Sequence, residues 1–394
     1  MQRIIVVPVL FLLTVMVFAQ SQRLEMLQSS FDSANRGTKL EVLRTADEED
    51  AETFGPLYAQ ALEHVINNAE NLGSDQVLRE IASIAVSRIA EGQYTAAADQ
   101  VWRLFGLYEE SSARIEIAEV LAELVDPESD TDTIDAMNAW VLRQNNLSRG
   151  GTRIDLQVLT AITETLGSLG SSSSFEALLD VVLADYPDFV GDTALAALEA
   201  LDGDSVQLAT EAVRSRDVDE RLTPFAFFME GDYLEQSAKA EVAQIALEDA
   251  LGLRPQSSEL QAEVREIRFL ASRVLRQAEY EPATGVLIRH FNETVLEYDR
   301  GRVVLARVLD AVSALGATGS EAAAQRLTEY LELLNTYTEI DRPSNTQLML
   351  SVISQLERLD YSLSYDALFA VTLLDGYPSR VQDAAREAMN SVAQ

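Results

Sequence analysis

The densest group of acidic side chains lies between Asp126 and Asp135, in the segment DPESDTDTID. Closely spaced carboxylates are typical of calcium loops, but a helix-loop-helix calcium site needs glycine at its sixth position and an acidic residue at its twelfth. Counted from Asp126, those positions hold Thr131 and Met137, so the loop does not fit. We interpret the aspartates as N-caps in a loop between two helices, with a weak, non-standard calcium site as the alternative.

The other residues that could carry chemistry are sparse. His64 and His290 are the only histidines; neither has a second histidine three or four residues away, and both are expected on helix surfaces. The chain has no cysteine, no Gly-x-Ser-x-Gly elbow, and no phosphate-binding or dinucleotide-binding glycine motif. The sequence therefore predicts no catalytic residue, no cofactor and no metal site. A carboxylate pair of the glycosidase type stays open, because such pairs have no fixed sequence spacing.

Two tryptophans are candidates for binding rather than for catalysis. Trp102 and Trp140 fall in segments expected to be the second helices of helix pairs. A tryptophan exposed on such a helix can stack on a sugar or anchor a peptide, because it combines a large area with a polar N–H group. Tryptophans at such positions more often fill the core between helices.

A second aromatic group lies in the segment TPFAFFMEGDY, where Pro224 interrupts the helical pattern. This group is either a plug in the core or an exposed docking patch, and we favour the core. Taken together, the candidate partner-binding residues are Trp102, Trp140, Phe225, Phe227, Phe228 and Tyr233.

These candidates must be positioned by a repeated pair of short helices, which is clearest from Arg153 to Val182. Apolar residues at helical spacing predict the first helix, and Gly167 and Gly170 are expected to end it. The serines at 171–174 are expected to cap the second helix. Neither helix can bury its apolar face alone, so each must stack on a neighbour.

The pattern recurs along the chain. At an offset of 149 residues (302 minus 153), the segment from Arg302 repeats the one from Arg153. The segment Ser174 to Pro187 is also similar to Ser364 to Pro378, with one inserted residue. Four units in that offset correspond to a pitch of about 37 residues, which is typical of two-helix repeats. The same pitch places further repeat starts near Val77, Arg114, Asp192, Val264 and Asn345.

Two known repeat families share these features. Tyr94 with Ala97 and Ala98 resembles the G-x-Y-x-x-A pattern of tetratricopeptide repeats, and the segment Glu279 to Ala283 echoes it. The helix that follows an arginine, the Leu-Gly turn and the serine-capped second helix more closely resemble HEAT and armadillo repeats. The resemblance covers most of residues 75–394. It implies an all-α fold, a right-handed α-α superhelix of about seven or eight helix pairs, with a binding role and no catalytic residues.

The N-terminal residues have the layout of a secretory signal. Arg3 precedes fifteen mainly apolar residues, Ile4 to Phe18, which are fewer than the ~20 that span a bilayer. We therefore favour a cleaved signal over a membrane anchor. The predicted organisation is a signal peptide at 1–19, an N-terminal helical cap at 20–74, and a solenoid at 75–394 with an irregular unit near 220–240. The mature protein is expected to be periplasmic or secreted, without membrane insertion.

The net charge of −34 argues against nucleic acids and anionic membranes as partners, because the chain would repel both. Only two of the thirty basic residues are lysines, which fits either codon bias or an acidic surface adapted to a saline or alkaline exterior. The sequence predicts a non-enzymatic scaffold or adaptor in the bacterial cell envelope, which binds a basic or extended polypeptide along the concave groove of the solenoid. The alternative is a protein that binds or degrades polysaccharide or cell wall through groove tryptophans and carboxylates.

Overall fold

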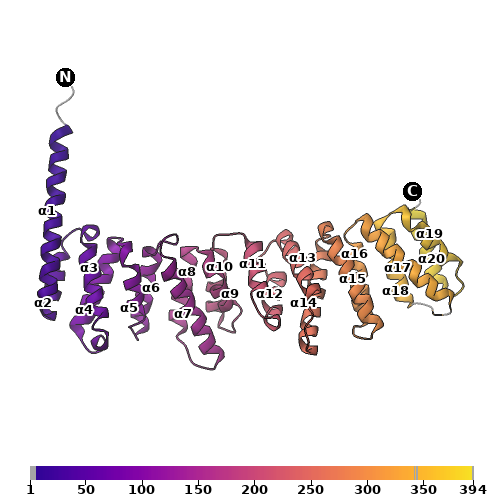
Figure 1. The fold of residues 1–394 in the computed structure, drawn as a ribbon, viewed down its shortest axis with the longest axis horizontal. Coiled ribbons are helices and arrows are strands. Elements are labelled where there is room, and N and C mark those ends of the chain that lie inside the picture. Colours follow the sequence, from indigo (N-terminus) through magenta and orange to yellow (C-terminus); the bar gives the residue numbers. More distant parts are fainter. Residues whose placement is uncertain (1–5, 341, 343–344, 393–394) are drawn as a thin grey trace, which may run out of the picture. The chain divides into compact units, whose positions relative to one another are not determined.

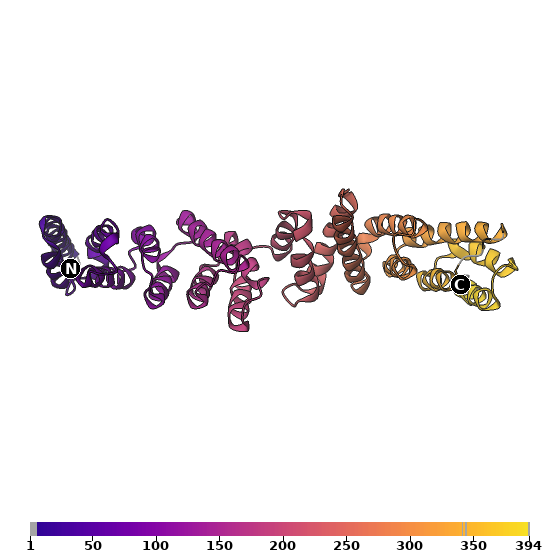
Figure 2. The ribbon, with the colours of Figure 1, turned by 90° about the horizontal axis from the view of Figure 1, so that it is seen from below.

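The computed structural model describes the backbone of residues 6–340, 342 and 345–392, and the side chains of these residues from Gln20 onward. Within these ranges the chain forms twenty α-helices and no β-strand, so the expected all-α fold is confirmed. The chain divides into two compact units, Met1–Asp202 and Gly203–Gln394. Figure 1 shows the order of the helices, and Figure 2 shows the helix pairs of each unit from below.

The first unit contains ten α-helices and three short 3-10 helices among its described residues. They are α1 (Val6–Ser33), α2 (Arg36–Ala46), α3 (Ala51–Ile66), η1 (Ala69–Asn71), α4 (Gln76–Glu91), η2 (Thr95–Ala97), α5 (Ala98–Phe105), α6 (Ser111–Leu124), α7 (Thr131–Arg149), α8 (Leu156–Leu169), η3 (Ser172–Ser174), α9 (Phe175–Val182) and α10 (Asp188–Glu199).

The second unit also contains ten α-helices and three 3-10 helices in its described part. They are α11 (Ser205–Arg214), η4 (Val218–Glu220), α12 (Leu222–Glu230), α13 (Gln236–Gly252), α14 (Ser258–Gln277), η5 (Glu281–Ala283), α15 (Thr284–Asp299), α16 (Leu305–Gly316), α17 (Glu321–Glu339), α18 (Thr346–Leu359), η6 (Ser362–Ser364), α19 (Tyr365–Leu373) and α20 (Ser379–Val392).

Each unit is a two-layer stack of helix pairs. Every odd-numbered helix packs on the next even-numbered helix to form a pair, from α1 with α2 to α19 with α20. Within each unit, odd-numbered helices contact the neighbouring odd-numbered helices, and even-numbered helices contact the even-numbered ones. This arrangement of neighbour-to-neighbour contacts is an α-solenoid. We call the two sets the odd layer and the even layer.

The described residues form ten helix pairs. Eight of these, from α5 with α6 to α19 with α20, lie within residues 75–394, which agrees with the seven or eight pairs expected for the solenoid there. All the predicted repeat starts fall on or next to even-layer helices: Val77 in α4, Arg114 in α6, Arg153 before α8, Asp192 in α10, Val264 in α14, Arg302 before α16 and Asn345 before α18. The sequence period therefore marked the even layer.

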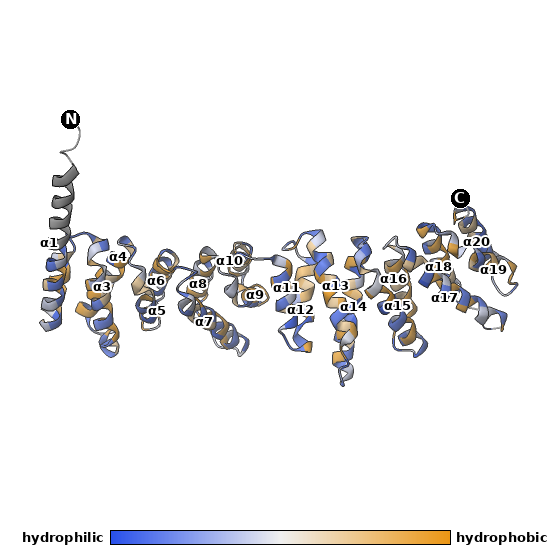
Figure 3. Ribbon diagram, turned by 45° about the horizontal axis from the view of Figure 1, so that its top comes forward, coloured by the Kyte–Doolittle hydropathy of each residue, from blue (hydrophilic) through white to orange (hydrophobic). Residues whose placement is uncertain are grey.

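Apolar burial holds the layers together. In α8, Val158, Leu159, Ile162 and Leu166 are fully buried between α6, α7 and α10. Burial of each such side chain contributes about 1.5–3 kcal/mol to folding. Figure 3 shows that apolar and polar residues are interleaved along the helices of both units rather than segregated in one part of the chain.

The expectation that Gly167 ends the first helix of the repeat is wrong. Gly167 lies inside α8, and the helix ends at Gly170, which has a φ of +68°. A Cβ atom at Gly167 would lie 2.6 Å from the Cβ of Ala197 in α10. The glycine is therefore needed for the close approach of two even-layer helices, while Gly170 supplies the left-handed residue that stops the helix.

The same buried hydrogen bonds join the last pairs of both units. In the first unit, the hydroxyl of Tyr186 donates to Oδ1 of the buried Asn145 at 2.8 Å, and Asn145 Nδ2 donates to Asp180 Oδ2 at 3.0 Å. In the second unit, the hydroxyl of Tyr377 donates to Oδ1 of Asn335 at 2.9 Å. Each asparagine thus fixes an odd-layer helix to the segment that leaves the next odd-layer helix.

We expect Asn145→Ala to lower the free energy of unfolding of the first unit by about 2 kcal/mol, because it leaves the half-buried Tyr186 hydroxyl without its acceptor and the buried Asp180 carboxylate without one of its donors. Both tryptophans lie in the first unit, so tryptophan fluorescence during urea unfolding reports that unit. Asn335→Ala should instead shift only part of the circular dichroism transition and leave the fluorescence midpoint unchanged.

The matched control is Asn146→Ala, at the exposed neighbour on α7, which should leave both transitions unchanged. Equal shifts of the fluorescence midpoint by Asn145→Ala and Asn335→Ala would contradict the prediction, because they would show that the two units unfold as one.

Candidate functional site

The two predicted tryptophans meet at one buried ring on the odd layer. Trp102 in α5 stacks on Phe105 with ring centroids 4.8 Å apart and an interplanar angle of 13°. Trp140 in α7 meets the same ring edge-on, at 5.2 Å. Phe105 is fully buried, and both indoles are half-buried. One face of Trp102 is therefore used in packing, while part of each indole remains at the surface.

The aromatic segment near α12 is divided between core and surface. Phe225 and Phe228 are fully buried, whereas Phe227 and Tyr233 are half-buried. The ring of Phe227 lies 5.3 Å from that of Phe228 and 6.3 Å from that of Tyr233. The core interpretation thus holds for Phe225 and Phe228, and a role of any of these residues in binding stays a prediction. The structure places this group in the second unit and the tryptophans in the first.

The acidic loop uses its aspartates to fix its own backbone. Asp126 accepts hydrogen bonds from the Glu128 N–H at 3.0 Å and the Ser129 hydroxyl at 2.9 Å, and these bonds lower the pKa of Asp126. Asp130 accepts from the Asp126 N–H at 2.9 Å. No group of three His, Cys, Asp or Glu side chains suited to a metal ion occurs among the described residues.

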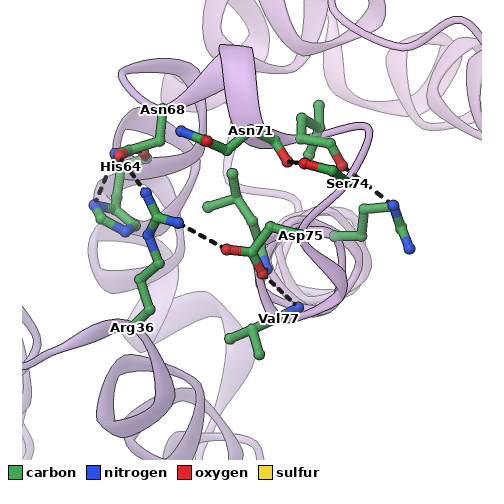
Figure 4. Close-up of polar contacts among 10 residues, drawn as sticks. Arg36, His64, Asn68, Asn71, Ser74, Asp75 and Val77 are labelled. Carbon is green, nitrogen blue, oxygen red and sulfur yellow. Dashed lines mark hydrogen bonds and ion pairs between the residues drawn. The ribbon is translucent and has the colours of Figure 1, made fainter.

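His64 in α3 is half-buried, and it belongs to a polar cluster that links α2, the end of α3 and the start of α4 (Figure 4). Arg36 donates to Asp75 Oδ2 at 2.7 Å and to Asn68 Oδ1 at 3.1 Å, and Asn68 donates to the His64 carbonyl at 2.8 Å. Asp75 also caps α4 through the Val77 N–H. Burial, and then the charges of Lys39 and Arg36, lower the pKa of His64, so the ring is neutral near pH 7.

The expectation that His290 lies on a helix surface is wrong. Its side chain is only 1% exposed, it lies edge-on to Phe269 at 5.7 Å, and neither ring nitrogen has a hydrogen-bond partner. Burial, and then the charge of Arg268, lower the pKa of His290 to about 3. A histidine within an apolar helical pattern gave no sign of its depth, because surface and core positions of such a helix differ by only one or two residues.

Beside His290 lies a buried ion pair between α14 and α15. Arg268 donates to Glu297 Oε2 at 2.8 Å and to the Thr294 hydroxyl at 3.4 Å, and all three side chains are buried. Thr294 in turn donates to the His290 carbonyl at 2.8 Å. The cluster uses its charges internally, so it joins two helices rather than presenting a reactive group to solvent. Sequence spacing did not reveal this pairing, because the partners come from different helices.

Large exposed apolar side chains, which the sequence analysis did not identify, lie mainly on the odd layer. On the described α-helices the large exposed apolar side chains are Met26, Leu147, Phe189, Leu296, Leu333, Tyr337, Tyr365, Phe369 and Leu373. Eight of these nine lie on odd-numbered helices, and Phe189 in α10 is the exception. The half-buried Trp102 and Trp140 belong to the same layer. The odd layer thus carries apolar surface that packing between helices does not use.

Comparison with known proteins adds little to this description. No family model matches the chain, and no curated protein matches it. One solved structure, from a study of a phosphorylation switch that controls the interaction between cadherin and β-catenin, has 13% identity over 94% of this chain and 90% of that chain, with a TM-score of 0.28. Another, from the computational design of self-assembling cyclic homooligomers, has 14% identity over 97% and 92%, with a TM-score of 0.12. At these TM-scores neither likeness carries an argument about this chain.

The predicted signal peptide at 1–19 is described only in part. Residues 1–5 are not described, and residues 6–19 are described only as helical backbone of α1. Among the described residues, no helix has the length and the apolar character needed to cross a membrane. The predicted boundaries at 19/20 and 74/75 stay predictions.

We expect the stability of the second unit to fall as the pH drops below about 6.5, because unfolding releases His290 to bind a proton that the folded state excludes. His290 has a folded pKa below its unfolded value, so its contribution is complete above pH 6.5 and is lost toward pH 3. In the parent chain, His290 should lower the free energy of unfolding by about 1.4 kcal/mol for each pH unit below 6.5. The His290→Leu variant should lack this decrease.

Urea unfolding followed by circular dichroism from pH 7.5 to 4.5 measures the effect as the difference between the variant and the parent chain. His64→Leu is the comparison in the first unit, where the change should appear in tryptophan fluorescence. An identical pH dependence in His290→Leu and the parent would show that His290 is not buried and neutral.

Proposed function

We propose that this protein is a non-enzymatic scaffold or adaptor, a HEAT- or armadillo-like solenoid of the bacterial cell envelope that binds a partner protein along its odd layer. The observation that carries the proposal is the asymmetry between the layers. Eight of the nine large exposed apolar side chains on the described α-helices lie on odd-numbered helices. Exposed apolar groups that lie close together, such as those on α17 and α19, mark interaction sites rather than packing.

The partner's charge follows from the composition. With a net charge of −34, the chain attracts basic polypeptides and repels nucleic acids and other acidic polymers. Tyrosine and tryptophan side chains such as Tyr337, Trp102 and Trp140 are typical anchors in protein interfaces, because they bury a large area with little loss of conformational freedom. A basic polypeptide with apolar side chains therefore fits this surface in both respects.

The location in the envelope rests on the sequence. The charged start, the apolar run to Phe18 and the small residue Ala19 are typical of a secretory signal. A chain without cysteine does not depend on the redox state of its compartment, since packing alone holds the fold.

A site-specific photo-crosslinking amino acid at Leu147, Leu296 or Tyr337 tests the proposal in cells of the native host. We expect all three odd-layer positions to give an adduct with the same protein, identified by mass spectrometry. The matched control is Phe189, which is 51% exposed but lies on the even-layer helix α10, and it should not give that adduct.

Two outcomes would contradict the proposal. One is that the odd-layer positions give no protein adduct beyond that of the Phe189 control. The other is that the protein is retained on cell-wall or glycan fractions without a protein adduct, which would favour polysaccharide binding through the tryptophans.

A further inference from the structure

The last odd-layer helix of the described chain, α19, carries an exposed apolar stripe. Tyr365, Phe369 and Leu373 are spaced four residues apart, so they lie along one face of the helix. Their side chains are 39%, 46% and 65% exposed. The rings of Tyr365 and Phe369 stack with centroids 6.5 Å apart. We call these three residues the α19 stripe.

The stripe points away from α17, the neighbouring helix of the odd layer. Asn335 in α17 donates a hydrogen bond to the Ala367 carbonyl at 3.1 Å, which fixes the side of α19 that faces α17. Tyr365 and Phe369 each lie two residues from Ala367, which is about 200° around a helix. The stripe is therefore on the side where the next odd-layer helix would stack.

The residues of α9 at the positions equivalent to Tyr365 and Phe369 are buried. The similarity of Ser174 to Pro187 with Ser364 to Pro378 matches Tyr365 to Phe175 and Phe369 to Leu179. Phe175 is only 3% exposed and Leu179 is fully buried. The equivalent positions are therefore buried in α9 and exposed in α19.

The neighbouring even-layer helix does not share this feature. The outward residues of α20 are polar, among them Arg380, Asp383, Arg386 and Glu387, all exposed. The exposed side of α20 is therefore polar, whereas that of α19 presents an apolar stripe.

Acidic residues surround the stripe. Asp360, Asp366 and Asp375 are exposed, and the segment 360–378 contains no lysine or arginine. An open pocket of about 690 Å³ adjoins the start of α19, lined by Leu363, Tyr365 and Val392 together with Asp360 and Asp366. A second copy of this chain would bring two such acidic rims together, which is unfavourable.

We propose that the α19 stripe docks an amphipathic α-helix of a basic partner protein. The inference rests on the proposed function and names the chemistry of its partner. The helix takes the place of a next odd-layer helix, its apolar residues cover Tyr365, Phe369 and Leu373, and its lysines or arginines face Asp360, Asp366 and Asp375. Such helix-in-groove recognition reads apolar anchors at helical spacing.

The test uses the full chain and a fluorescein-labelled peptide of about 18 residues, long enough to form a helix, with leucines at positions i, i+3, i+4 and i+7 and lysines elsewhere. Fluorescence anisotropy measures binding. We expect Phe369→Asp and Leu373→Asp each to weaken binding roughly tenfold or more, since both residues are central anchors. A peptide with glutamate in place of lysine should not bind.

The matched control is Phe189→Asp, which adds the same charge at an equally exposed phenylalanine of the even layer and should leave binding unchanged. Circular dichroism checks that all three variants fold, as expected for exposed positions.

Three results would overturn the inference. The first is that the lysine peptide fails to bind the parent chain. The second is that Phe369→Asp weakens binding no more than Phe189→Asp does, which would indicate attraction by charge alone. The third is a concentration-dependent dimer in sedimentation velocity that Phe369→Asp dissociates, which makes a second copy the occupant. None of these affects crosslinking from Leu147, Leu296 or Tyr337, so failure of the stripe and failure of the scaffold proposal are distinguishable.

Discussion

Every helix in this chain depends on its neighbours to bury its apolar face. A helix such as α8 has four fully buried aliphatic side chains, and these are covered by α6, α7 and α10. No cysteine is present to add a covalent link. Stability is then approximately a sum of contacts between adjacent helices, and the stack holds only where each contact is close. Gly167, which lets α8 approach Ala197 of α10, is a direct consequence of this constraint.

Polar groups fix the register of a stack that apolar packing alone would leave free to slide. The bond from Tyr186 to Asn145 and the one from Tyr377 to Asn335 occur at matching places in the two units. Arginines also bridge neighbouring helices of one layer, as in Arg307 with Glu266 at 3.0 Å and Arg289 with Glu248 at 2.7 Å. Each exposed pair contributes about 0–1 kcal/mol at most. Their larger effect is on the surface charge. Many of the few basic side chains are engaged in these ion pairs, so the remaining surface is acidic.

The two layers differ in their repeat signal and in their exposed apolar side chains. Even-layer helices carry the repeat signal of the sequence and only one of the large exposed apolar side chains on the described α-helices, Phe189. Odd-layer helices carry the others, together with Trp102 and Trp140. Apart from the two tryptophans, which pack on Phe105, binding on the odd layer, as proposed, uses residues that the fold does not need for stacking. A solenoid of this kind can therefore vary most of its partner surface without loss of the fold.

The sequence by itself determined the all-α fold, the two-helix repeat and the even-layer period, because helical spacing of apolar residues and glycine turns are local signals. It paired each even-layer helix with the odd-layer helix that follows it, as α8 with α9, whereas the structure packs α8 on α7 and α9 on α10. It also indicated the core position of Phe225 and Phe228. Only the tertiary structure decided which side of each helix is covered. His290 is buried and Tyr365 is exposed, although both lie in apolar helical segments. The depth of a side chain depends on which helices lie beside it, and neither the junction of Trp102 with Trp140 on Phe105 nor the opening beside α19 is encoded within a single helix.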